Sequence, residues 1–369
     1  MAREIHIHNK SDKPDNILMK EALIDEKCLE MQKLLPSFLR GFFMYLKNSL
    51  LPMSRLAYLQ DTTFFFNYLM TDTGLTDAKE LSQIKLEDIQ KIKAVDVNIF
   101  IDYCRKYRVE KENGTYIFQN DNRSLARKKS VLSVMFKYLY REELVEKNIT
   151  DGFDPIRLPK AGDKEIKALE IGEVEIMIDA VSSGTGLTKK ELQYWEKTKL
   201  RDKAILLVFV TYGLRLSELH QLNISSFNFN REEFKIFRKR GKETSMPLNK
   251  SVKRAVNQYI KYERPAPIDK DGIDADALFL SLQGRRMTER QIRVLVKKYT
   301  SIALGTDRDS GYSPHKLRAT TATTLIEKGK SIFDVQELLN HDNITTTQLY
   351  AAHKKNAKRD LIKDSEWDE

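Results

Sequence analysis

Arg215 and Glu218 are a candidate functional pair of opposite charge. They lie three positions apart in TYGLRLSEL, residues 211–219, so both side chains can share one face of a helix. The apolar run AILLVFV, residues 204–210, comes directly before them. An arginine in such surroundings usually binds a carboxylate or a phosphate through two parallel hydrogen bonds. A weak surface ion pair is the alternative interpretation.

His315 and Arg318 form a second pair, in SPHKLRATTATTL at residues 313–325. The Ser-Pro dipeptide predicts the start of a helix, and the spacing of three puts both side chains on one face of its first turn. A helix N-terminus also favours anions. The pattern of a histidine and an arginine three apart is common by chance, so it gains weight only beside the first pair.

Basic residues also gather in KIFRKRGK, residues 235–242, where five of the eight are lysine or arginine. One interpretation is a solvated turn between two strands. The other is a ribbon that lies on a nucleic-acid backbone.

His341 and Tyr350 lie nine positions apart in LLNHDNITTTQLY, residues 338–350. A tyrosine on an apolar helical face is usually a core residue. The alternative is a nucleophile, and since the pKa of a free phenol is about 10, it would need cations and a proton acceptor close by.

Composition narrows the class of protein. The 369 residues are enough for two domains, and the net charge of +10 suits a phosphate-rich partner. Cys28 and Cys104 form no CxxC motif, which excludes a cysteine zinc site and fits the reducing cytoplasm. His6 and His8 have no third ligand nearby, so we interpret them as terminal residues rather than a metal site. No apolar run is long enough to span a membrane, and the N-terminus does not resemble a secretory signal.

Helical periodicity dominates the first half of the chain. It predicts an all-helical region over residues 20–150, with Ser54 as the N-cap of one helix. The clearest helix is expected at residues 124–148, where apolar side chains line one face. ENGTYIF, residues 112–118, is interpreted as a turn.

Residues 151–165 contain two prolines and two glycines without helical periodicity, which indicates a linker. Beyond it, a long buried helix is expected at residues 192–213, ending at Gly213, and another helix with Thr288 as its N-cap. Alternation of apolar and polar residues predicts four short strands, at residues 227–230, 232–237, 244–249 and 277–282.

TYGLRLSEL, SPHKLRATTATTL and LLNHDNITTTQLY closely resemble the three conserved blocks of the tyrosine recombinases, the class that includes phage integrases and Xer-like enzymes. SLARKKSVLSVMFKYLYREELVEKNITDGF and the linker segment IRLPK extend the resemblance, which covers residues 36–355. Ala319 and Asn340 stand where many relatives have histidine and glycine, which concerns the subfamily more than the activity.

The resemblance implies a mainly α fold: a helical SAM-like core-binding domain and a mostly helical catalytic domain with a small antiparallel β-sheet, forming a C-shaped clamp on DNA. The expected division is residues 1–30 as an N-terminal extension, 31–150 as the core-binding domain, 151–165 as the linker, 166–355 as the catalytic domain and 356–369 as a tail. Apolar residues of the tail either pack within the chain or dock onto a neighbouring protomer.

Carried over residue by residue, the resemblance also implies a catalytic set. Arg215 and Arg318 would hold the non-bridging oxygens of the scissile phosphate and stabilise its growing charge. Glu218 would support them. Lys239, with Lys242 as the alternative, would protonate the departing 5′-oxygen as general acid.

Tyr350 would attack phosphorus and leave a 3′-phosphotyrosyl link. His315 would help to accept the tyrosine proton, and His341 would hydrogen-bond the phosphate. Such chemistry needs no cofactor and no metal, in keeping with the lack of a GxxxxGK[ST] motif and of a carboxylate cluster for Mg²⁺.

The implied function is site-specific recombination through a Holliday junction, for integration or excision of a mobile element or for dimer resolution. The implied partners are double-stranded DNA with specific recombination sites and further copies of this chain, which would form a tetramer on two sites. Accessory DNA-bending factors are possible additional partners, and no membrane is involved. A type IB topoisomerase-like enzyme and a non-catalytic DNA-binding accessory factor are the alternatives. The predicted DNA contacts are Ser54, Tyr58, Arg127, Lys128, Lys129, Arg238, Arg240 and Lys242.

Overall fold

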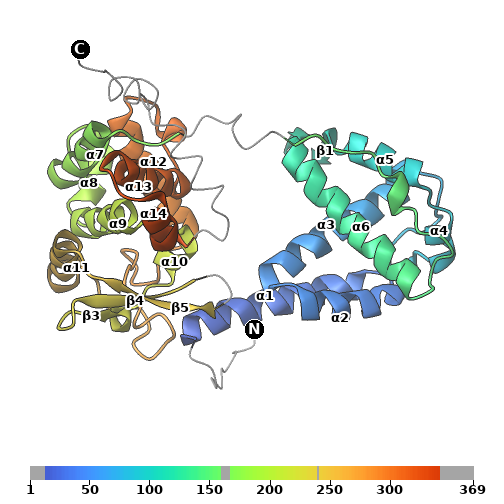
Figure 1. Cartoon of the computed structure of the whole chain (residues 1–369), viewed down its shortest axis with the longest axis horizontal. Helices are drawn as coiled ribbons and strands as arrows, with labels where there is room; N and C mark the ends of the chain where they lie inside the picture. The colour runs from blue at the N-terminus through green and yellow to red at the C-terminus, as the bar shows by residue number, and fades with distance from the viewer. Residues whose placement is uncertain (1–12, 159–166, 239–240, 341–369) are drawn as a thin grey trace, which may run out of the picture. The chain divides into compact units, whose positions relative to one another are not determined.

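The computed structural model describes residues 13–158, 167–238 and 241–340. These residues form two compact units, the first made of residues 17–158 and the second of residues 13–16 and 167–340 (Figure 1). Each unit has an apolar core of its own. The domain boundaries expected from the sequence stay predictions. Helix α1 (Asp15–Leu34) continues across the expected boundary between residues 30 and 31.

The first unit is built mainly of helices whose apolar faces meet in one core. After α1 they are α2 (Arg40–Ser49), α3 (Pro52–Asp72), α4 (Leu86–Gln90), α5 (Ala94–Tyr103) and α6 (Asn122–Arg141). Helix α6 confirms that a helix lies within residues 124–148, because Leu132, Phe136 and Leu139 on its apolar face are buried, but it ends at Arg141 and not at residue 148. It begins where the Asp121 side chain accepts a hydrogen bond from the Ser124 backbone amide.

A β-hairpin corrects the expectation that this unit is all-helical. Strands β1 (Lys106–Lys111) and β2 (Gly114–Gln119) pair antiparallel, so the segment interpreted as a turn is mostly strand. Tyr107 and Phe118 are cross-strand partners, and their rings stack with centroids 5.2 Å apart. Gly114, with φ of +126°, lets the chain reverse at a backbone angle that other residues rarely adopt. Aromatic cross-strand packing therefore helps to stabilise the hairpin.

The N-cap expected at Ser54 is also wrong. Helix α3 begins two residues earlier, at Pro52, with Leu51 as its N-cap. Proline is favoured at the first helical position because its fixed φ suits a helix and its missing amide would have no partner there. Ser54 therefore lies inside the first turn.

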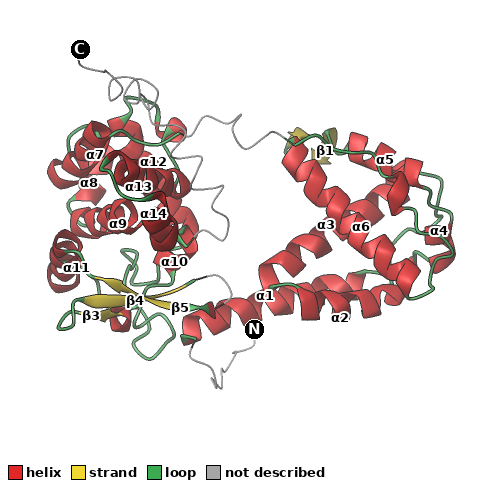
Figure 2. Cartoon of the chain, viewed as in Figure 1, coloured by secondary structure: helices red, strands yellow, loops and turns green. Residues whose placement is uncertain are grey.

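The second unit has a helical body and a three-stranded antiparallel sheet in the order β3-β4-β5 (Figure 2). Its helices are α7 (Ile171–Ser183), α8 (Lys189–Trp195), α9 (Lys199–Tyr212), α10 (Leu216–His220), α11 (Lys250–Tyr262), α12 (Glu289–Ala303), α13 (Pro314–Glu327) and α14 (Ile332–Leu339). The strands are β3 (Phe227–Asn228), β4 (Glu233–Phe237) and β5 (Glu243–Pro247). The predicted fold class, mainly helical with a small antiparallel sheet, is confirmed.

Two local expectations differ from this structure. The long helix expected at residues 192–213 is two helices, α8 and α9, separated after Trp195. The strand expected at residues 277–282 is instead a pair of isolated bridges, Asn223 with Ala277 and Leu280 with Arg286. By contrast, the N-cap at Thr288 is confirmed, since its side chain accepts from the Gln291 amide.

Helix α9 is central to the second unit and carries the site at its C-terminal end. It packs against α7, α11 and α13, so apolar side chains are buried on all its sides. At its N-terminal end the Glu263 carboxylate accepts from the backbone amides of Leu200 and Arg201, at 2.9 and 2.7 Å. An acceptor anion there satisfies free amides and complements the helix dipole.

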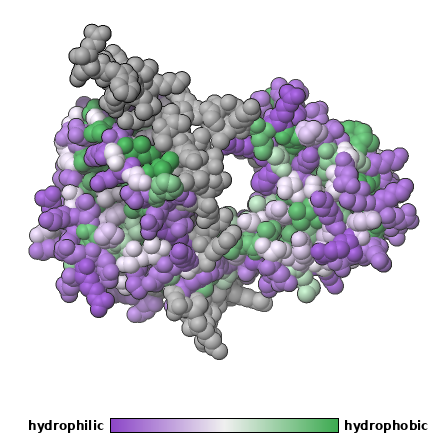
Figure 3. Space-filling model, in the orientation of Figure 1, coloured by the Kyte–Doolittle hydropathy of each residue, from purple (hydrophilic) through white to green (hydrophobic). Residues whose placement is uncertain are grey.

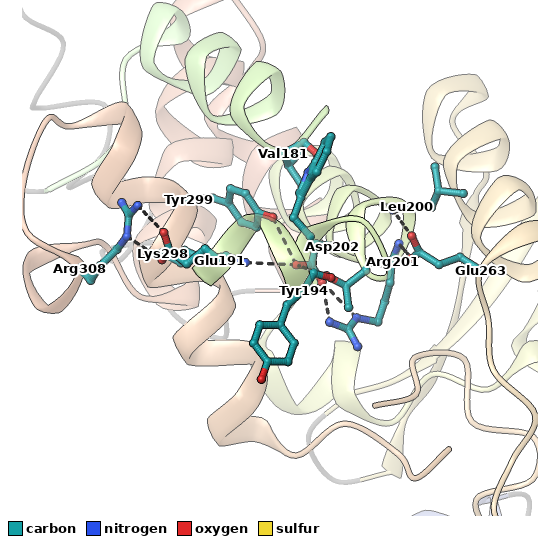
Figure 4. Close-up of polar contacts among 12 residues, drawn as sticks. Val181, Glu191, Tyr194, Leu200, Arg201, Asp202, Glu263, Lys298, Tyr299 and Arg308 are labelled. Carbon is teal, nitrogen blue, oxygen red and sulfur yellow. Dashed lines mark hydrogen bonds and ion pairs between the residues drawn. The ribbon is translucent and has the colours of Figure 1, made fainter. Parts of the chain in front are cut away.

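Asp202, on the first turn of α9, anchors neighbouring elements (Figure 4). Its buried carboxylate accepts from Arg201 at 2.8 Å, from Lys298 at 3.5 Å and from the Tyr299 hydroxyl at 3.4 Å. Burial and the adjacent Asp202 carboxylate raise the pKa of Tyr299. These contacts hold α12 against α9, the helix whose C-terminal end carries the site.

The surface drawn in Figure 3 is mostly hydrophilic over both units, with smaller apolar areas. Within the described ranges, no helix has the length and apolar character needed to cross a bilayer. The same ranges hold no group of three or more histidine, cysteine or acidic side chains that could bind a metal ion.

Candidate active site

The end of helix α9 is shaped by Gly213. Its φ of +59° is left-handed, and its amide donates to the Phe209 carbonyl to close the helix. A Cβ at this position would lie 2.5 Å from Leu339 Cδ2 and 3.3 Å from Thr321 Cβ. Glycine therefore allows both the turn into α10 and the close approach of α13 and α14.

Arg215 follows as the N-cap residue of α10, paired with Glu218 as expected from their spacing. Its Nη1 donates to Glu218 Oε1 at 2.8 Å, and its backbone amide donates to Glu218 Oε2 at 2.7 Å. The Glu218 side chain is only 3% exposed, whereas that of Arg215 is 33% exposed. The carboxylate thus holds the arginine from the protein side and leaves part of the guanidinium open to an anion.

Arg318 lies on the second turn of α13 and is buried. Its Nη1 donates to the Gly213 carbonyl at 2.7 Å, and its Nη2 donates to the Leu339 carbonyl. The Thr321 hydroxyl, one turn further on, contacts the carbonyls of Phe209 and Val210, each at 3.1 Å. Helix α13 is therefore tied to the C-terminal end of α9, which brings Arg318 close to Arg215.

His315 is the second residue of the same helix, and part of its side chain is exposed to solvent. Partial desolvation of its ring, together with the positive charges of Arg318 and Arg215, lowers its pKa. A neutral imidazole is thereby favoured near neutral pH, and only the neutral form can accept a proton.

The C-terminal end of α14 is the acceptor on which three guanidinium groups converge. Arg238 Nη2 donates to the Leu338 carbonyl at 2.8 Å, Arg318 Nη2 to that of Leu339, and Arg215 Nη2 to that of Asn340 at 3.1 Å. The last carbonyls of a helix have no partner within it and carry the negative end of its dipole. They can therefore hold cations that would otherwise repel one another.

Sequence reasoning missed this position of Arg238, which was expected among exposed basic residues that contact DNA. Arg238 is only 5% exposed, and Phe234 and Ile236 before it are buried as well. Side chains on a strand alternate between its two faces, so the spacing of two from Ile236 was the available signal. The basic composition of the segment concealed it.

The structure describes only some of the other residues expected to act at the site or to contact DNA beside it. Lys239, Arg240, His341 and Tyr350 lie outside the described residues. Lys242 is exposed, and its backbone carbonyl accepts from the Arg238 amide at 2.8 Å.

The first unit carries the other expected DNA contacts. Ser54 and Tyr58 are half-buried on α3, one turn apart. Lys128 is buried with its Nζ 3.0 Å from Asp61 Oδ1, and Lys129 donates to the Phe153 carbonyl at 3.3 Å. Arg127 also pairs with Asp61, but its side chain stays 48% exposed. Lys128 and Lys129 thus bind protein acceptors, whereas Arg127 keeps an accessible surface.

Comparison with known proteins identifies the class. Residues 173–357 match the family model described as the phage integrase family. Tyrosine recombinase XerC of Natranaerobius thermophilus is 33% identical over 280 residues, which cover 75% of this chain and 84% of that protein. XerC of Alcanivorax borkumensis is 34% identical over 228 residues, 62% of this chain and 68% of that protein. Fold and sequence thus define a tyrosine recombinase.

Solved structures agree on the fold. XerH site-specific recombinase bound to a palindromic difH substrate, a post-cleavage complex, aligns with a TM-score of 0.61 at 20% identity over 95% of this chain and 90% of that one. A lambda integrase dimer bound to a COC′ core site aligns with a TM-score of 0.54 at 16% identity over 90% of this chain and 79% of that one. The chain belongs to the phage integrase family.

Proposed function

We propose that this tyrosine recombinase exchanges strands between specific DNA sites through a 3′-phosphotyrosyl intermediate, with Arg215 and Arg318 binding the scissile phosphate. One observation carries the assignment: guanidinium groups from α10 and α13, far apart in the sequence, are held on adjacent carbonyls at one helix end. Such fixed donors stabilise a phosphoryl-transfer transition state because they need no reorganisation as charge develops.

In the proposed reaction one bond to phosphorus forms while another breaks. The Tyr350 oxygen attacks phosphorus, a P–O bond to tyrosine forms, and the bond to the 5′-oxygen breaks. Neutral His315 helps to accept the tyrosine proton, which its lowered pKa supports. Lys239, or Lys242 as the alternative, gives a proton to the 5′-oxygen, and His341 hydrogen-bonds the phosphate. The link conserves the phosphodiester energy, so a second 5′-hydroxyl can reverse the step.

Binding of duplex DNA involves both units in this proposal. Residues 31–150 act as the core-binding domain, with Ser54, Tyr58 and Arg127 as the contacts that keep accessible surface. Contacts of this kind to phosphate give affinity and register rather than sequence readout. We place the enzyme in the cytoplasm, as a tetramer on two sites, with its exposed Lys242 facing the DNA backbone.

The biological task is integration or excision of a mobile element, or resolution of DNA dimers. The XerC relatives and the alignment with XerH bound to difH support recombination rather than relaxation by a topoisomerase-like enzyme. A non-catalytic accessory factor is disfavoured, because it would not need Arg215, Glu218 and Arg318 in a preorganised set.

A trapping experiment tests the proposal. The chain is incubated with fragmented DNA of its host, and fragments held covalently after denaturation are sequenced to give the cleavage site. A duplex of that site, nicked beside the cleavage position so that the released strand is lost, should trap the wild-type enzyme. Tyr350→Phe should bind this duplex with unchanged affinity and form no adduct. Absence of any wild-type adduct, or an adduct formed equally by Tyr350→Phe, would overturn the proposal.

A further inference from the structure

Arg238 occupies an unusual place for an arginine of a basic hairpin. It follows β4 directly and lies on the same face as Phe234 and Ile236, both buried in the core of the second unit. A guanidinium cannot lose its charge at ordinary pH, so burying it is costly unless acceptors surround it.

The acceptors around Arg238 are few. Its Nη2 donates to the Leu338 carbonyl at 2.8 Å and lies 3.7 Å from the Met246 sulfur. Its Nε and Nη1 are buried and have no hydrogen-bond partner in the described part of the chain. Buried donors without partners cost roughly 1–3 kcal/mol in folded proteins. An apolar side chain of similar length would therefore serve the core as well or better.

The electrostatic surroundings also do not favour an arginine for stability alone. Arg215 and Arg318 bind the next two carbonyls after Leu338, and their positive charges oppose that of Arg238. Glu218 is close enough to attract Arg238, although its oxygens are hydrogen-bonded to Arg215. A residue kept at a cost to stability is more readily explained by activity than by folding.

What Arg238 does hold is the end of α14. Leu338 is followed by Leu339 and Asn340. The Leu339 carbonyl accepts from Arg318, and the Asn340 carbonyl accepts from Arg215. Asn340 has a left-handed backbone, with φ of +49°, and the next residue is His341. A small shift of Leu338 would therefore move the acceptors of both arginines.

We propose that Arg238 is a positioning residue for strand cleavage: by binding the Leu338 carbonyl it fixes the end of α14, and so the guanidinium groups of Arg215 and Arg318 around the scissile phosphate. This role rests on the proposed function of those two arginines. It differs from the contact with the DNA backbone that its basic neighbours suggested.

Arg238→Met tests the proposal, because methionine fills similar space and removes only the donors and the charge. We expect its melting temperature to equal or exceed that of the wild type, since buried unpaired donors are lost. We expect its affinity for the nicked duplex to change less than threefold. Its single-turnover rate of adduct formation at saturating enzyme should fall about 30- to 100-fold, in keeping with the effect of misplacing catalytic groups by about 1 Å.

Two further variants make the outcome decisive. Arg238→Lys can still donate to Leu338 and should recover at least tenfold of the lost rate. Lys261→Met removes one positive charge from an exposed position on α11 and should cleave at the wild-type rate.

Three results would overturn the inference: a wild-type rate in Arg238→Met, a parallel loss of melting temperature and rate that Arg238→Lys does not restore, or a loss confined to DNA affinity. Failure of the proposed function is distinct, because then the wild type itself would form no adduct.

Discussion

Replacing Gly213 with alanine should damage both the stability of the second unit and the geometry of the site. The backbone φ of +59° costs an alanine about 1 kcal/mol relative to glycine. The new methyl group would also lie 2.5 Å from Leu339 Cδ2, and overpacking of this kind costs about 1–3 kcal/mol. We therefore expect Gly213→Ala to lower the free energy of unfolding by about 2–4 kcal/mol.

A double-mutant cycle with Leu339→Ala separates the two contributions. Shortening Leu339 removes the atom 2.5 Å from the new methyl group and leaves only the milder contact with Thr321 Cβ at 3.3 Å, so in that background the cost of Gly213→Ala should approach the backbone contribution of about 1 kcal/mol. Urea unfolding followed by the fluorescence of buried Trp195 gives all four free energies.

Activity provides a second readout for the same variant. The Gly213 carbonyl accepts from Arg318 Nη1 at 2.7 Å, and Leu339 supplies the other acceptor of that guanidinium. Single-turnover cleavage by Gly213→Ala should therefore fall about tenfold or more while the protein is still folded. An equal cost of Gly213→Ala in both backgrounds, or unchanged cleavage, would refute the close packing of α9 against α14 as the cause.

Three further predictions concern charged groups. Glu218→Gln keeps the size of the side chain but removes the buried charge that Arg215 binds. It should lower the free energy of unfolding by about 1–3 kcal/mol, since Arg215 is partly exposed, and in single-turnover assays it should reduce the cleavage rate by a larger factor than it reduces DNA affinity in titrations. His315 has a pKa below its ordinary 6.5, so the neutral base persists on acidification. The cleavage rate should stay constant from pH 8 to 6.5 and decline only below pH 6.5. A midpoint of the rate decline above pH 6.5 that His315→Asn abolishes would contradict this prediction. Although burial raises the pKa of Glu191, hydrogen bonds from Arg308 and Thr188 lower it to about 2, so its contribution to folding stability is complete above the ordinary pKa of 4.5 and disappears as pH falls toward 2. Glu191→Gln should therefore lower the free energy of unfolding by about 1 kcal/mol at pH 7. A difference in unfolding free energy from the wild type that fails to narrow below pH 4.5 in urea titrations would count against this prediction.

The sequence predicted the parts of the site that depend on local spacing. The three-residue separation of Arg215 and Glu218 fixes them on one helical face, whatever the rest of the fold does. The apolar residues before them predicted a buried α9, and Gly213 predicted where it ends. The helix start at Ser313-Pro314 likewise follows from the restricted backbone of proline.

Features that depend on contacts distant in sequence could not be predicted in the same way. The β1–β2 hairpin is stabilised by Tyr107 against Phe118 and by Phe64 of α3, which no local pattern reveals. The grouping of Arg318 with Arg238 depends on where α14 ends in space. Local reasoning therefore found the donors, whereas their common acceptor required the tertiary structure.

The charge balance of the site bears on how it distinguishes the transition state from the bound substrate. Among the described residues of the site, Arg215, Arg238 and Arg318 carry three positive charges beside the carboxylate of Glu218, an excess of two when His315 is neutral, and the lysine proposed as general acid would add to it. A phosphodiester brings one negative charge, whereas a pentacoordinate phosphorane brings about two. The excess is therefore compensated more completely in the transition state than in the ground state, and this difference is what accelerates a reaction.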